Sequence, residues 1–577
     1  MPEHSVDPDR PWLRSYDAGV APSIDIPPIT IPDLLRRSAQ QHPNQTATVF
    51  FGARLTYRRL LEDANRFAHG LAALGVKSGD RVAIMLPNCP QTIIAYYATL
   101  SLGAIAVMTN PLYTEPELVR QWTETGVEVA VVLDRLWPRV RPVRSAVPLR
   151  QVIVTGIQDY LPFPKNLLFP LKARREGTWV DVPIGADTRS FRQVMRGQPV
   201  TGPGVTLRPE DVACLQYTGG TTGVPKGAML THGNLVATVM QIRQFLMPGS
   251  QEAEDRIVAI LPIFHVYGMN AVMNLGVHLA ATLILLPLPD LPMLLRAVQA
   301  ERPTFFLGIP ALYAAINNYP GVEKLDLTSI KACFSGGAPL PVDVIARFEQ
   351  LTGARIAEAY GLTEASSVTH VNPRFGRHKF GSVGVPIVGC DARIVDAETG
   401  TRDLPPGEVG EIAVRGPQVM KGYWRQPAES DAVLRDGPGS PWLFTGDLGK
   451  MDEDGYFFIL DRKKELILSA GFNVYPREVE ETLAQHPAVQ ESSVIGIPDA
   501  LRGERIKAFV ILKPGAAATP AQLISFCRDR LTPYKVPRAV EFRATLPRTA
   551  TGKVSRRLLR EEELTRRPVL AKDDPAG

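Results

Sequence analysis

The sequence predicts an α/β protein: a large N-terminal domain of α/β layers with parallel sheets and a β subdomain, followed by a small α+β domain. Three observations predict it. At 577 residues the chain exceeds what a single hydrophobic core supports, so at least two packed units are expected. Apolar strand-like runs alternate with amphipathic helical stretches, which is typical of parallel sheets covered by helices. This alternation gives way to short strand-like pieces near residue 381 and to a second α+β pattern near residue 465.

The predicted large domain covers residues 1–460. Its strand-like runs include "RVAIMLP", "EVAVVLD", "RQVIVTG", "DVACLQYT", "RIVAILP", "ATLILLP" and "TFFLGIP". Two uncharged stretches, 82–114 and 257–289, are long enough to cross a bilayer. Proline and glycine interrupt both, so we interpret each as a strand–helix–strand unit of a buried parallel sheet.

Beyond Gly381 the short pieces "DARIVDAETG", "GEVGEIAVRG" and "DGYFFILDRKK" predict a compact β subdomain. The charged "DRKK", residues 461–464, marks the predicted boundary with a small domain at 465–565. There Pro476 suits the first turn of a helix whose Val479 and Leu483 share one face. "KAFVILKPG" predicts a strand and "AQLISFCRDRL" a helix. Residues 566–577 are expected to form a disordered tail.

Composition excludes several classes of protein. The net charge of +5 is small beside 64 basic and 59 acidic residues, so we expect no nucleic-acid partner. The five cysteines are far apart and form no C-x-x-C pair, which favours free thiols in a reducing compartment over a zinc site. The N-terminal residues lack a secretory pattern. We therefore expect a cytoplasmic protein, and a homodimer remains open.

The stretch "YTGGTTGVPKGAMLTH", 217–232, has the composition of a phosphate-binding loop. A glycine-rich turn between a strand and a helix, here capped by Thr231 or Asn234, leaves backbone N–H groups free to face an anion. The alternative, a flexible surface loop, would not require threonine hydroxyls beside a lysine. Gly227 follows Lys226, so the loop is not a Walker A motif. The candidate phosphate-binding residues are Thr218, Gly219, Gly220, Thr221, Thr222, Gly223 and Lys226.

This loop resembles the signature loop of the adenylate-forming superfamily, which includes acyl-CoA synthetases, luciferases and peptide-synthetase adenylation domains. Four further motifs follow in that family's order: "YGLTE" (360–364), "TGD" (445–447), "DRKKELI" (461–467) and "PRTATGK" (547–553). With "LPIFHVYG" (261–268) the resemblance covers nearly the whole chain. It implies a two-step ligase in which ATP converts a carboxylic acid to an acyl-AMP, releasing pyrophosphate, before CoA captures the acyl group.

The resemblance also implies a role for each matched residue. The loop would cradle the β and γ phosphates, Thr363 would bind the α phosphate and Glu364 would hold Mg²⁺. Asp447 would accept the ribose hydroxyls, and Arg462 would add a ribose or phosphate contact. The adenine pocket would be formed by Gly336, Gly337, Ala338 and Tyr360. Taken singly, such residues are more often helix caps, turn residues or solvated charges.

The resemblance also implies one set of residues for adenylation and another for thioester formation. Lys553 is expected to neutralise the charge that accumulates in adenylation. For thioester formation, the family rotates its mobile small domain about a hinge, which Lys464 matches. The segment "SAGFNVYP" (469–476) would then complete the CoA site, through Gly471 and Phe472.

The acid is expected to be a long-chain fatty acid. Peptide-synthetase domains place an aspartate where His265 stands, so an amino acid would lack its counterion. We expect His265 to line the acyl and thiol passage, with a core histidine as the alternative. The segments "NPLYTEPEL", "DRKKELILSAGFNVYPREVE" and "WLRSYDAGVAPSIDIP" resemble bacterial long-chain fatty acyl-CoA synthetases. Candidate tunnel residues are Tyr267, Met269, Met273 and Gly308, although core packing uses the same residue types. In some relatives a tryptophan gate stands where Met269 aligns.

Several alternatives remain. An acyl-AMP ligase could pass the acyl group to a carrier protein, and a medium-chain or aryl acid could replace the fatty acid. A P-loop kinase is disfavoured by the loop, and a noncatalytic acyl-binding protein would not release pyrophosphate. The stretch 157–177 joins apolar residues to a basic cluster. It suits either peripheral contact with the inner face of a membrane or an insertion packed on the large domain.

Overall fold

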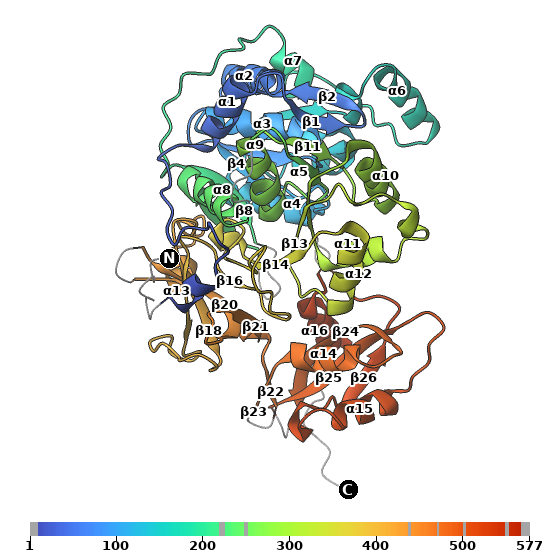
Figure 1. The fold of residues 1–577 in the computed structure, drawn as a ribbon. Helices are drawn as coiled ribbons and strands as arrows, with labels where there is room; N and C mark the ends of the chain where they lie inside the picture. Colours follow the sequence, from blue (N-terminus) through green and yellow to red (C-terminus); the bar gives the residue numbers. More distant parts are fainter. Residues whose placement is uncertain are drawn as a thin grey trace.

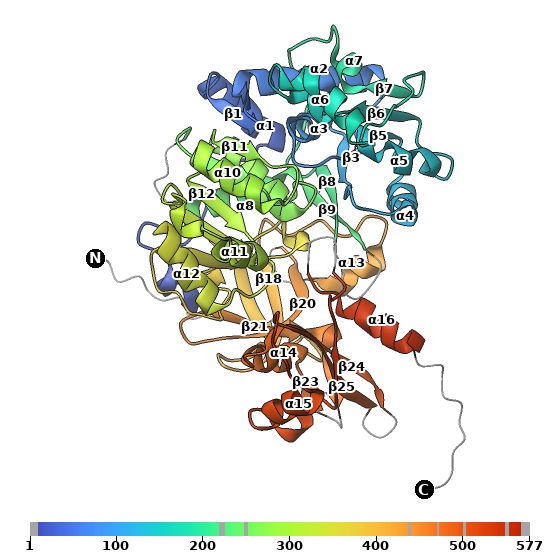
Figure 2. The same cartoon turned by 90° about the vertical axis from the view of Figure 1, so that its right-hand side faces the viewer.

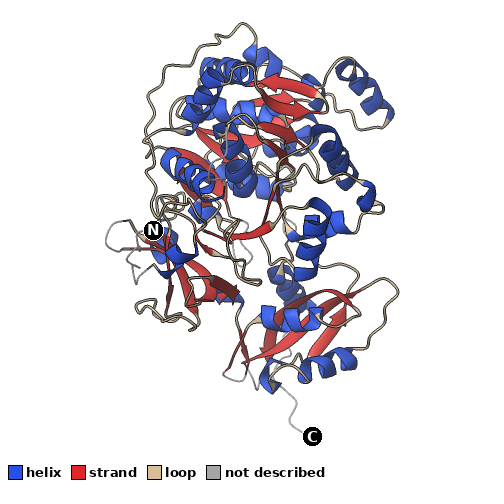
Figure 3. Cartoon of the chain, in the orientation of Figure 1, coloured by secondary structure: helices blue, strands red, loops and turns tan. Residues whose placement is uncertain are grey.

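The computed structural model describes residues 10–218, 225–246, 252–436, 440–469, 472–499, 503–548 and 553–566. Helices and strands alternate through the large domain, and the small domain lies at the end of the molecule remote from α2 and α6 (Figures 1 and 2). The β subdomain, rich in strands, lies beside the small domain (Figure 3). These features match the α/β class predicted from the sequence.

The first large sheet has nine strands in the described residues, and its central strands are parallel. In spatial order they are β16 (Val385–Pro386), β15 (His370–Val371), β14 (Ile356–Tyr360), β13 (Ala332–Gly336), β12 (Phe305–Gly308), β10 (Arg256–Ala259), β11 (Thr282–Leu285), β1 (Thr46–Phe50) and β2 (Ala53–Thr56).

The second large sheet has seven strands in the same described ranges, and all but β9 run parallel to their neighbours. In spatial order they are β7 (Thr188–Ser190), β6 (Gln151–Thr155), β5 (Val129–Leu133), β3 (Arg81–Met85), β4 (Ile105–Met108), β8 (Val212–Tyr217) and β9 (Gly227–Thr231).

The two layers share one core. The stretch 82–114 forms β3, α3 and β4, and 257–289 forms β10, the π-helix η4 (Tyr267–Asn274), α9 and β11, as predicted. α3 is buried almost along its whole length, which explains its uniformly apolar sequence. The Tyr97 hydroxyl donates a 3.0 Å hydrogen bond to Asn274 Oδ1, joining α3 of one layer to η4 of the other. None of the described helices combines the length and apolar content needed to cross a bilayer.

Thirteen described helices accompany these strands and the β subdomain. They are α1 (Ile31–Gln41), α2 (Tyr57–Ala73), α3 (Pro90–Ser101), α4 (Glu115–Thr125), α5 (Trp137–Val143), α6 (Lys165–Arg175), α7 (Phe191–Met195), α8 (His232–Leu246), α9 (Leu275–His278), α10 (Leu291–Glu301), α11 (Pro310–Asn317), α12 (Val342–Thr352) and α13 (Pro427–Val433).

The β subdomain is a largely antiparallel sheet of β17 (Asp391–Val395), β18 (Gly410–Arg415), β20 (Trp442–Met451), β19 (Leu434–Arg435) and β21 (Phe457–Arg462). The small domain contains β22 (Ile467–Ser469), β23 (Phe472–Val474), β24 (Val489–Asp499), β25 (Gly503–Leu512), β26 (Ala539–Phe542), α14 (Pro476–Ala484), α15 (Pro520–Arg528) and α16 (Arg556–Arg566). Val479 and Leu483 are fully buried on one face of α14, as the helical spacing predicts.

One local prediction was wrong. The glycine-rich loop was expected to connect a strand directly to a helix, but residues 227–231 form β9, antiparallel to β8. The helix α8 starts only at His232, after a reciprocal cap in which the Asn234 N–H donates to Thr231 Oγ1 at 3.1 Å and the Thr231 N–H to Asn234 Oδ1 at 3.0 Å. The loop is therefore the tip of a hairpin, and the N-terminus of α8 is not its anion-binding group.

Candidate active site

The base of the hairpin loop is fixed by hydrogen bonds between its two ends. The Thr218 N–H donates to the Lys226 carbonyl at 2.9 Å, and Thr218 Oγ1 accepts from the Lys226 N–H at 3.3 Å. The predicted phosphate-binding residues Gly219, Gly220, Thr221, Thr222 and Gly223 lie outside the described part of the chain. The structure thus places the two flanking members of the set beside each other.

Lys226 belongs to a chain of polar contacts that ends at Glu364. Its ammonium pairs with Glu429 of α13 and lies 4.9 Å from the centre of the Tyr423 ring. The Tyr423 hydroxyl donates a 2.8 Å hydrogen bond to Glu364 Oε1. One aromatic side chain therefore contacts both the predicted phosphate-binding lysine and the predicted metal-binding carboxylate.

Glu364 has the chemistry that a magnesium site needs. It follows the buried Thr363 in the short helix η6 (Thr363–Ala365), directly after β14. Among the described residues no group of three or more His, Cys, Asp and Glu side chains could hold a metal. Mg²⁺ in nucleotide sites is commonly held by one or two carboxylates together with substrate phosphates, so a single glutamate fits this ion.

Asp447, Arg462 and Tyr360 form a cluster in which the aspartate and the tyrosine are buried and the arginine side chain is 45% exposed. Tyr360 ends β14 and its hydroxyl donates a 2.5 Å hydrogen bond to Asp447 Oδ2, while Arg462 Nε lies 2.6 Å from Asp447 Oδ1. Burial raises the pKa of Asp447, and the Arg462 guanidinium opposes that shift. The carboxylate also raises the pKa of Arg462. Each carboxylate oxygen retains lone pairs for further donors.

Lys553 brings the small domain to the large one. A methyl group built on Gly337 would lie 3.6 Å from Lys553 Cε, so the lysine stem runs directly over this glycine. Gly337 has φ +90°, a conformation that glycine adopts without strain. The Lys553 side chain keeps some contact with solvent, but desolvation by the surrounding residues lowers its pKa, and the Arg462 guanidinium adds to that effect.

His265 faces the same region. Its Nδ1 accepts a 3.2 Å hydrogen bond from the Tyr267 N–H. Desolvation lowers the pKa of His265 to about 4, with a further contribution from the positive charge of Lys553. The imidazole is therefore neutral at physiological pH. Gly336 and Ala338 flank Gly337, and Gly336 is so close to Tyr267 that an added methyl group would lie 3.2 Å from Cε1 of that ring.

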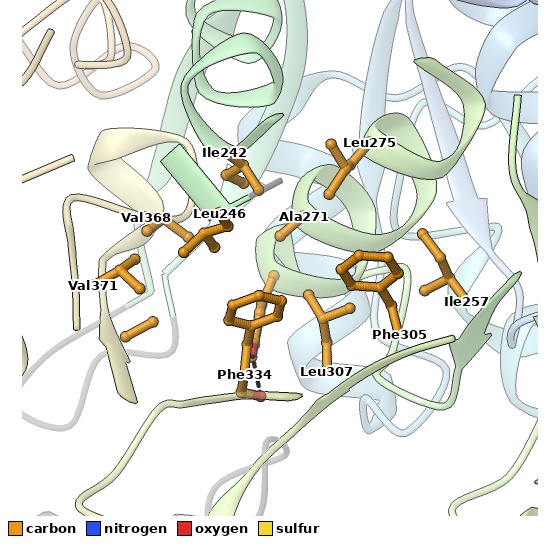
Figure 4. A pocket seen from close by; sticks show the side chains of 12 residues that line it. Ile242, Leu246, Ile257, Ala271, Leu275, Phe305, Leu307, Phe334, Val368 and Val371 are labelled. Carbon is orange, nitrogen blue, oxygen red and sulfur yellow. Dashed lines mark hydrogen bonds between the residues drawn. The ribbon is translucent and has the colours of Figure 1, made fainter. Parts of the chain in front are cut away.

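Figure 4 shows an apolar cavity. Its wall, which includes Tyr267, combines residues from η4, α8, α9 and the strands β10, β12, β13, β14 and β15. The Tyr267 hydroxyl donates to the Phe334 carbonyl at 3.3 Å, so the polar atom of this wall is already hydrogen-bonded. The free volume is about 20 Å³, enough for about one water molecule. The lining residues are Ile242, Leu246, Ile257, Tyr267, Ala271, Leu275, Phe305, Leu307, Phe334, Ala359, Val368 and Val371.

The predicted tunnel residues do not all reach this cavity. Tyr267 lines it, together with Ala271 and Leu275 at successive intervals of four residues. Met269 is fully buried elsewhere, with its sulfur 3.9 Å from Cys214 Sγ, and Met273 is equally buried outside the cavity wall. Gly308 also lies outside the wall. A methyl group there would lie 2.9 Å from Tyr313, so that glycine allows close packing.

The predicted hinge is a short link between two strands. β21 runs through Arg462, two residues beyond the predicted end of the large domain, and β22 starts at Ile467. Lys464 is exposed in the turn between them. Arg556 holds the start of the link, since its Nη1 donates to Asp461 Oδ1 at 2.9 Å and its Nη2 to Glu480 Oε2 at 2.6 Å. Glu465 is a third partner.

Phe472 lies on another face of the small domain. It is 52% exposed and stacks on Tyr534 with ring centres 4.5 Å apart. Its predicted companion Gly471 falls outside the described residues, as does the predicted tail from 567 onward, while Arg566 still belongs to α16. Sequence reasoning missed Tyr423, which contacts Lys226 and Glu364, and Glu429, which pairs with Lys226. Neither residue belongs to a recognised motif, so no sequence signal marked them.

Comparison with known proteins gives two family matches. Residues 35–424 match the AMP-binding enzyme model, and residues 478–553 match the AMP-binding enzyme C-terminal domain. A long-chain-fatty-acid–CoA ligase of Bacillus subtilis is 47% identical over 96% of this chain and 98% of its own length. A protein of the same description from Yersinia pestis is 38% identical over 96% and 98%, respectively. A feruloyl-CoA synthase of an Amycolatopsis species is 35% identical over 90% and 96%.

Solved structures of other proteins have the same fold as this chain. ATP-bound MatB from Rhodopseudomonas palustris has a TM-score of 0.81 at 31% identity, covering 92% of this chain and 99% of its own. The apo form of that protein has a lower TM-score, 0.71, at the same identity and coverage. The chain is therefore arranged more like the nucleotide-bound form. With both family domains matched in order along the sequence, the chain belongs to the AMP-binding enzyme family, the adenylate-forming superfamily that its motifs predict.

Proposed function

We propose that the protein is an AMP-forming long-chain fatty acid:CoA ligase. Fatty acid and ATP would give acyl-AMP and pyrophosphate, and acyl-AMP and CoA would then give acyl-CoA and AMP. The observation that carries this proposal is the position of Lys553. It lies over Gly337, where its charge acts on the Asp447–Arg462 pair and on His265. Tyr267, which lines an apolar cavity, packs against the neighbouring Gly336.

In the first step, the fatty carboxylate attacks the α phosphorus of ATP and pyrophosphate leaves. Lys553 would neutralise the negative charge that the attacking carboxylate and the α phosphate bring together. Thr363 would hydrogen-bond the α phosphate, while Thr218, Lys226 and the rest of the hairpin loop would hold the β and γ phosphates. Glu429 pairs with Lys226 in the structure, so the triphosphate would replace this carboxylate.

The nucleoside would be held by the cluster of Asp447, Arg462 and Tyr360. Asp447, paired with Arg462, has acceptor capacity for the ribose hydroxyls. Gly336, Gly337, Ala338 and Tyr360 surround the adenine position. Mg²⁺, held by Glu364 with phosphate oxygens of ATP, would screen the charge of the triphosphate. Tyr423 would orient Glu364 through its 2.8 Å hydrogen bond.

In the second step, CoA sulfur attacks the acyl carbonyl and AMP leaves. Rotation of the small domain about Lys464 would withdraw Lys553 and bring the face of Gly471 and Phe472 to the site. The exposed Phe472 ring, held in place by stacking on the partly buried Tyr534, supports this proposal because it is available to a ligand. Neutral His265 would line the passage between acyl group and thiol.

The apolar wall behind Tyr267 supports a hydrocarbon substrate. About 20 Å³ cannot hold a long acyl chain, so side chains around the cavity must move when the acid binds. An aryl acid is a second candidate, favoured by the 35% identity with a feruloyl-CoA synthase. The cell location we propose is the cytoplasm, with peripheral contact at the inner face of the membrane through 157–177.

The test is pyrophosphate release by purified protein with Mg²⁺, ATP and acids of graded chain length, with and without CoA. We expect AMP and acyl-CoA from long-chain acids. Release without CoA dependence, together with acyl transfer to a carrier protein, would indicate the acyl-AMP ligase instead. Preference for aromatic acids would select the second candidate, and ADP as the product would refute both.

A further inference from the structure

The helix α6 exposes its apolar side chains instead of burying them. Leu167, Leu168 and Leu171 are 63%, 55% and 63% exposed, and Phe163 just before the helix is 80% exposed. Phe169 and Ala173 face inward, where Arg135 lies 5.7 Å from the centre of the Phe169 ring and Ala173 is buried. An insertion that merely packs on the large domain would turn its leucines toward that domain.

Basic side chains surround these leucines. The eleven residues of α6 include Lys165, Lys172, Arg174 and Arg175, all exposed, and no acidic residue. Glu176 directly after the helix lies 3.8 Å from Lys172, which compensates one of the four charges. We call the exposed leucines, Phe163 and these four basic residues the α6 patch.

The α6 patch is held in a fixed position. Lys165 Nζ donates a 3.2 Å hydrogen bond to the carbonyl of Phe51, which is itself 38% exposed at the turn between β1 and β2. At the other end the Arg174 guanidinium lies 4.9 Å from the centre of the Trp179 ring. The apolar side chains are therefore presented by an anchored helix and not by a loose loop.

We propose that the α6 patch docks on the surface of a bilayer that contains anionic lipids. Leucine and phenylalanine side chains would enter the interface between headgroups and acyl chains, while the lysines and arginines would contact lipid phosphates. The excess of positive charge favours an anionic surface over a second copy of the same patch, which would bring like charges together. α6 lies far from the small domain in both views, so docking leaves that domain free (Figures 1 and 2).

Flotation of the full-length protein with vesicles tests this proposal, and it does not require catalysis. We expect the protein to float with phosphatidylcholine vesicles that contain phosphatidylglycerol, more weakly at high salt and with phosphatidylcholine alone. Replacing the three leucines together, Leu167→Asn, Leu168→Asn and Leu171→Asn, should weaken binding by more than about tenfold. Lys172→Glu, Arg174→Glu and Arg175→Glu together should abolish the preference for anionic vesicles.

A matched control is the pair Leu288→Asn and Phe375→Asn, whose parent side chains are 61% and 62% exposed but lie outside the α6 patch. This control should float like the wild type, and thermal melting should show that every variant is folded. The proposal is overturned if wild-type protein does not float, or if the leucine variant floats as well as the control. If the wild type is a dimer, and the leucine variant is a monomer that floats as well as the wild type, the α6 patch is a contact between two copies of the protein and not a membrane-docking surface.

Discussion

Replacing Lys553 should separate the two half-reactions. In the structure its stem lies over Gly337, and its charge acts on His265, Asp447 and Arg462. Unit charges about 4 Å apart interact by about 4 kcal/mol at an effective dielectric constant near 20. A single donor at developing negative charge contributes about 2.7–4 kcal/mol. At about 1.4 kcal/mol per factor of ten, Lys553→Ala should slow adenylation by about 10²–10³-fold.

The assay measures each step by itself. Pyrophosphate release reports adenylation, and single-turnover conversion of supplied acyl-AMP with CoA reports thioester formation. The second rate should stay within about twofold of wild type, because Lys553 contacts no reacting atom in that step under the proposed rotation. Lys513→Ala, which removes another exposed lysine of the small domain, is the control. An equal loss in both steps would refute the reasoning.

The same residue predicts a pH dependence. The protonated ammonium is the active form, and its pKa is lowered from the ordinary lysine value of 10.5 by desolvation and by Arg462. Adenylation should therefore fall as pH rises through a value below 10.5. Arginine is not deprotonated in this range, so the residual activity of Lys553→Arg should lack that alkaline decline.

Three other substitutions test the ion pairs of Arg556, the hinge and the cavity. Arg556→Met leaves the largely buried Glu480 without its cation and should lower the free energy of unfolding of the small domain by about 3–5 kcal/mol, measured with urea; an unchanged midpoint would contradict this. Lys464→Pro fixes φ at the hinge and should slow thioester formation more than adenylation, and an equal change in both rates, measured by rapid quench, would argue against rotation there. Ala271→Val adds two methyl groups beside about 20 Å³ of free volume and should lower kcat/KM about tenfold more for long than for short acids; an unaltered chain-length profile would exclude the cavity from the acyl path.

The fold class and several local features could be predicted from the sequence, and the structure shows the physical basis of these predictions. Gly336 and Tyr360 lie at the same edge of the first sheet because they end the neighbouring parallel strands β13 and β14. The apolar run 82–114 is uniform because α3 is buried on all sides. Strand ends and apolar runs are encoded by neighbouring residues and by the order of strands along the chain, so both can be predicted from a single sequence.

Other features depend on distant contacts. β9 starts with glycine and is stabilised by pairing with β8 and by a bridge between Ala228 and Tyr423, which lies far along the chain. Tyr267, Ala271 and Leu275 line the cavity at intervals of four residues, whereas Met269 and Met273 lie on another side of the same helical stretch. Which side of this stretch borders the cavity depends on the strands packed against it. A cavity within an apolar core has no signature in composition.

The link between β21 and β22 consists of four residues, 463–466. Even fully extended, four residues span at most about 14 Å, so the link keeps the small domain close to the large one. Under the proposed rotation, each molecule then holds either the adenylation or the thioester-forming orientation at any instant. A substitution that speeds one half-reaction by favouring its orientation would make the opposite orientation rarer, and overall turnover would be fastest when neither is strongly preferred.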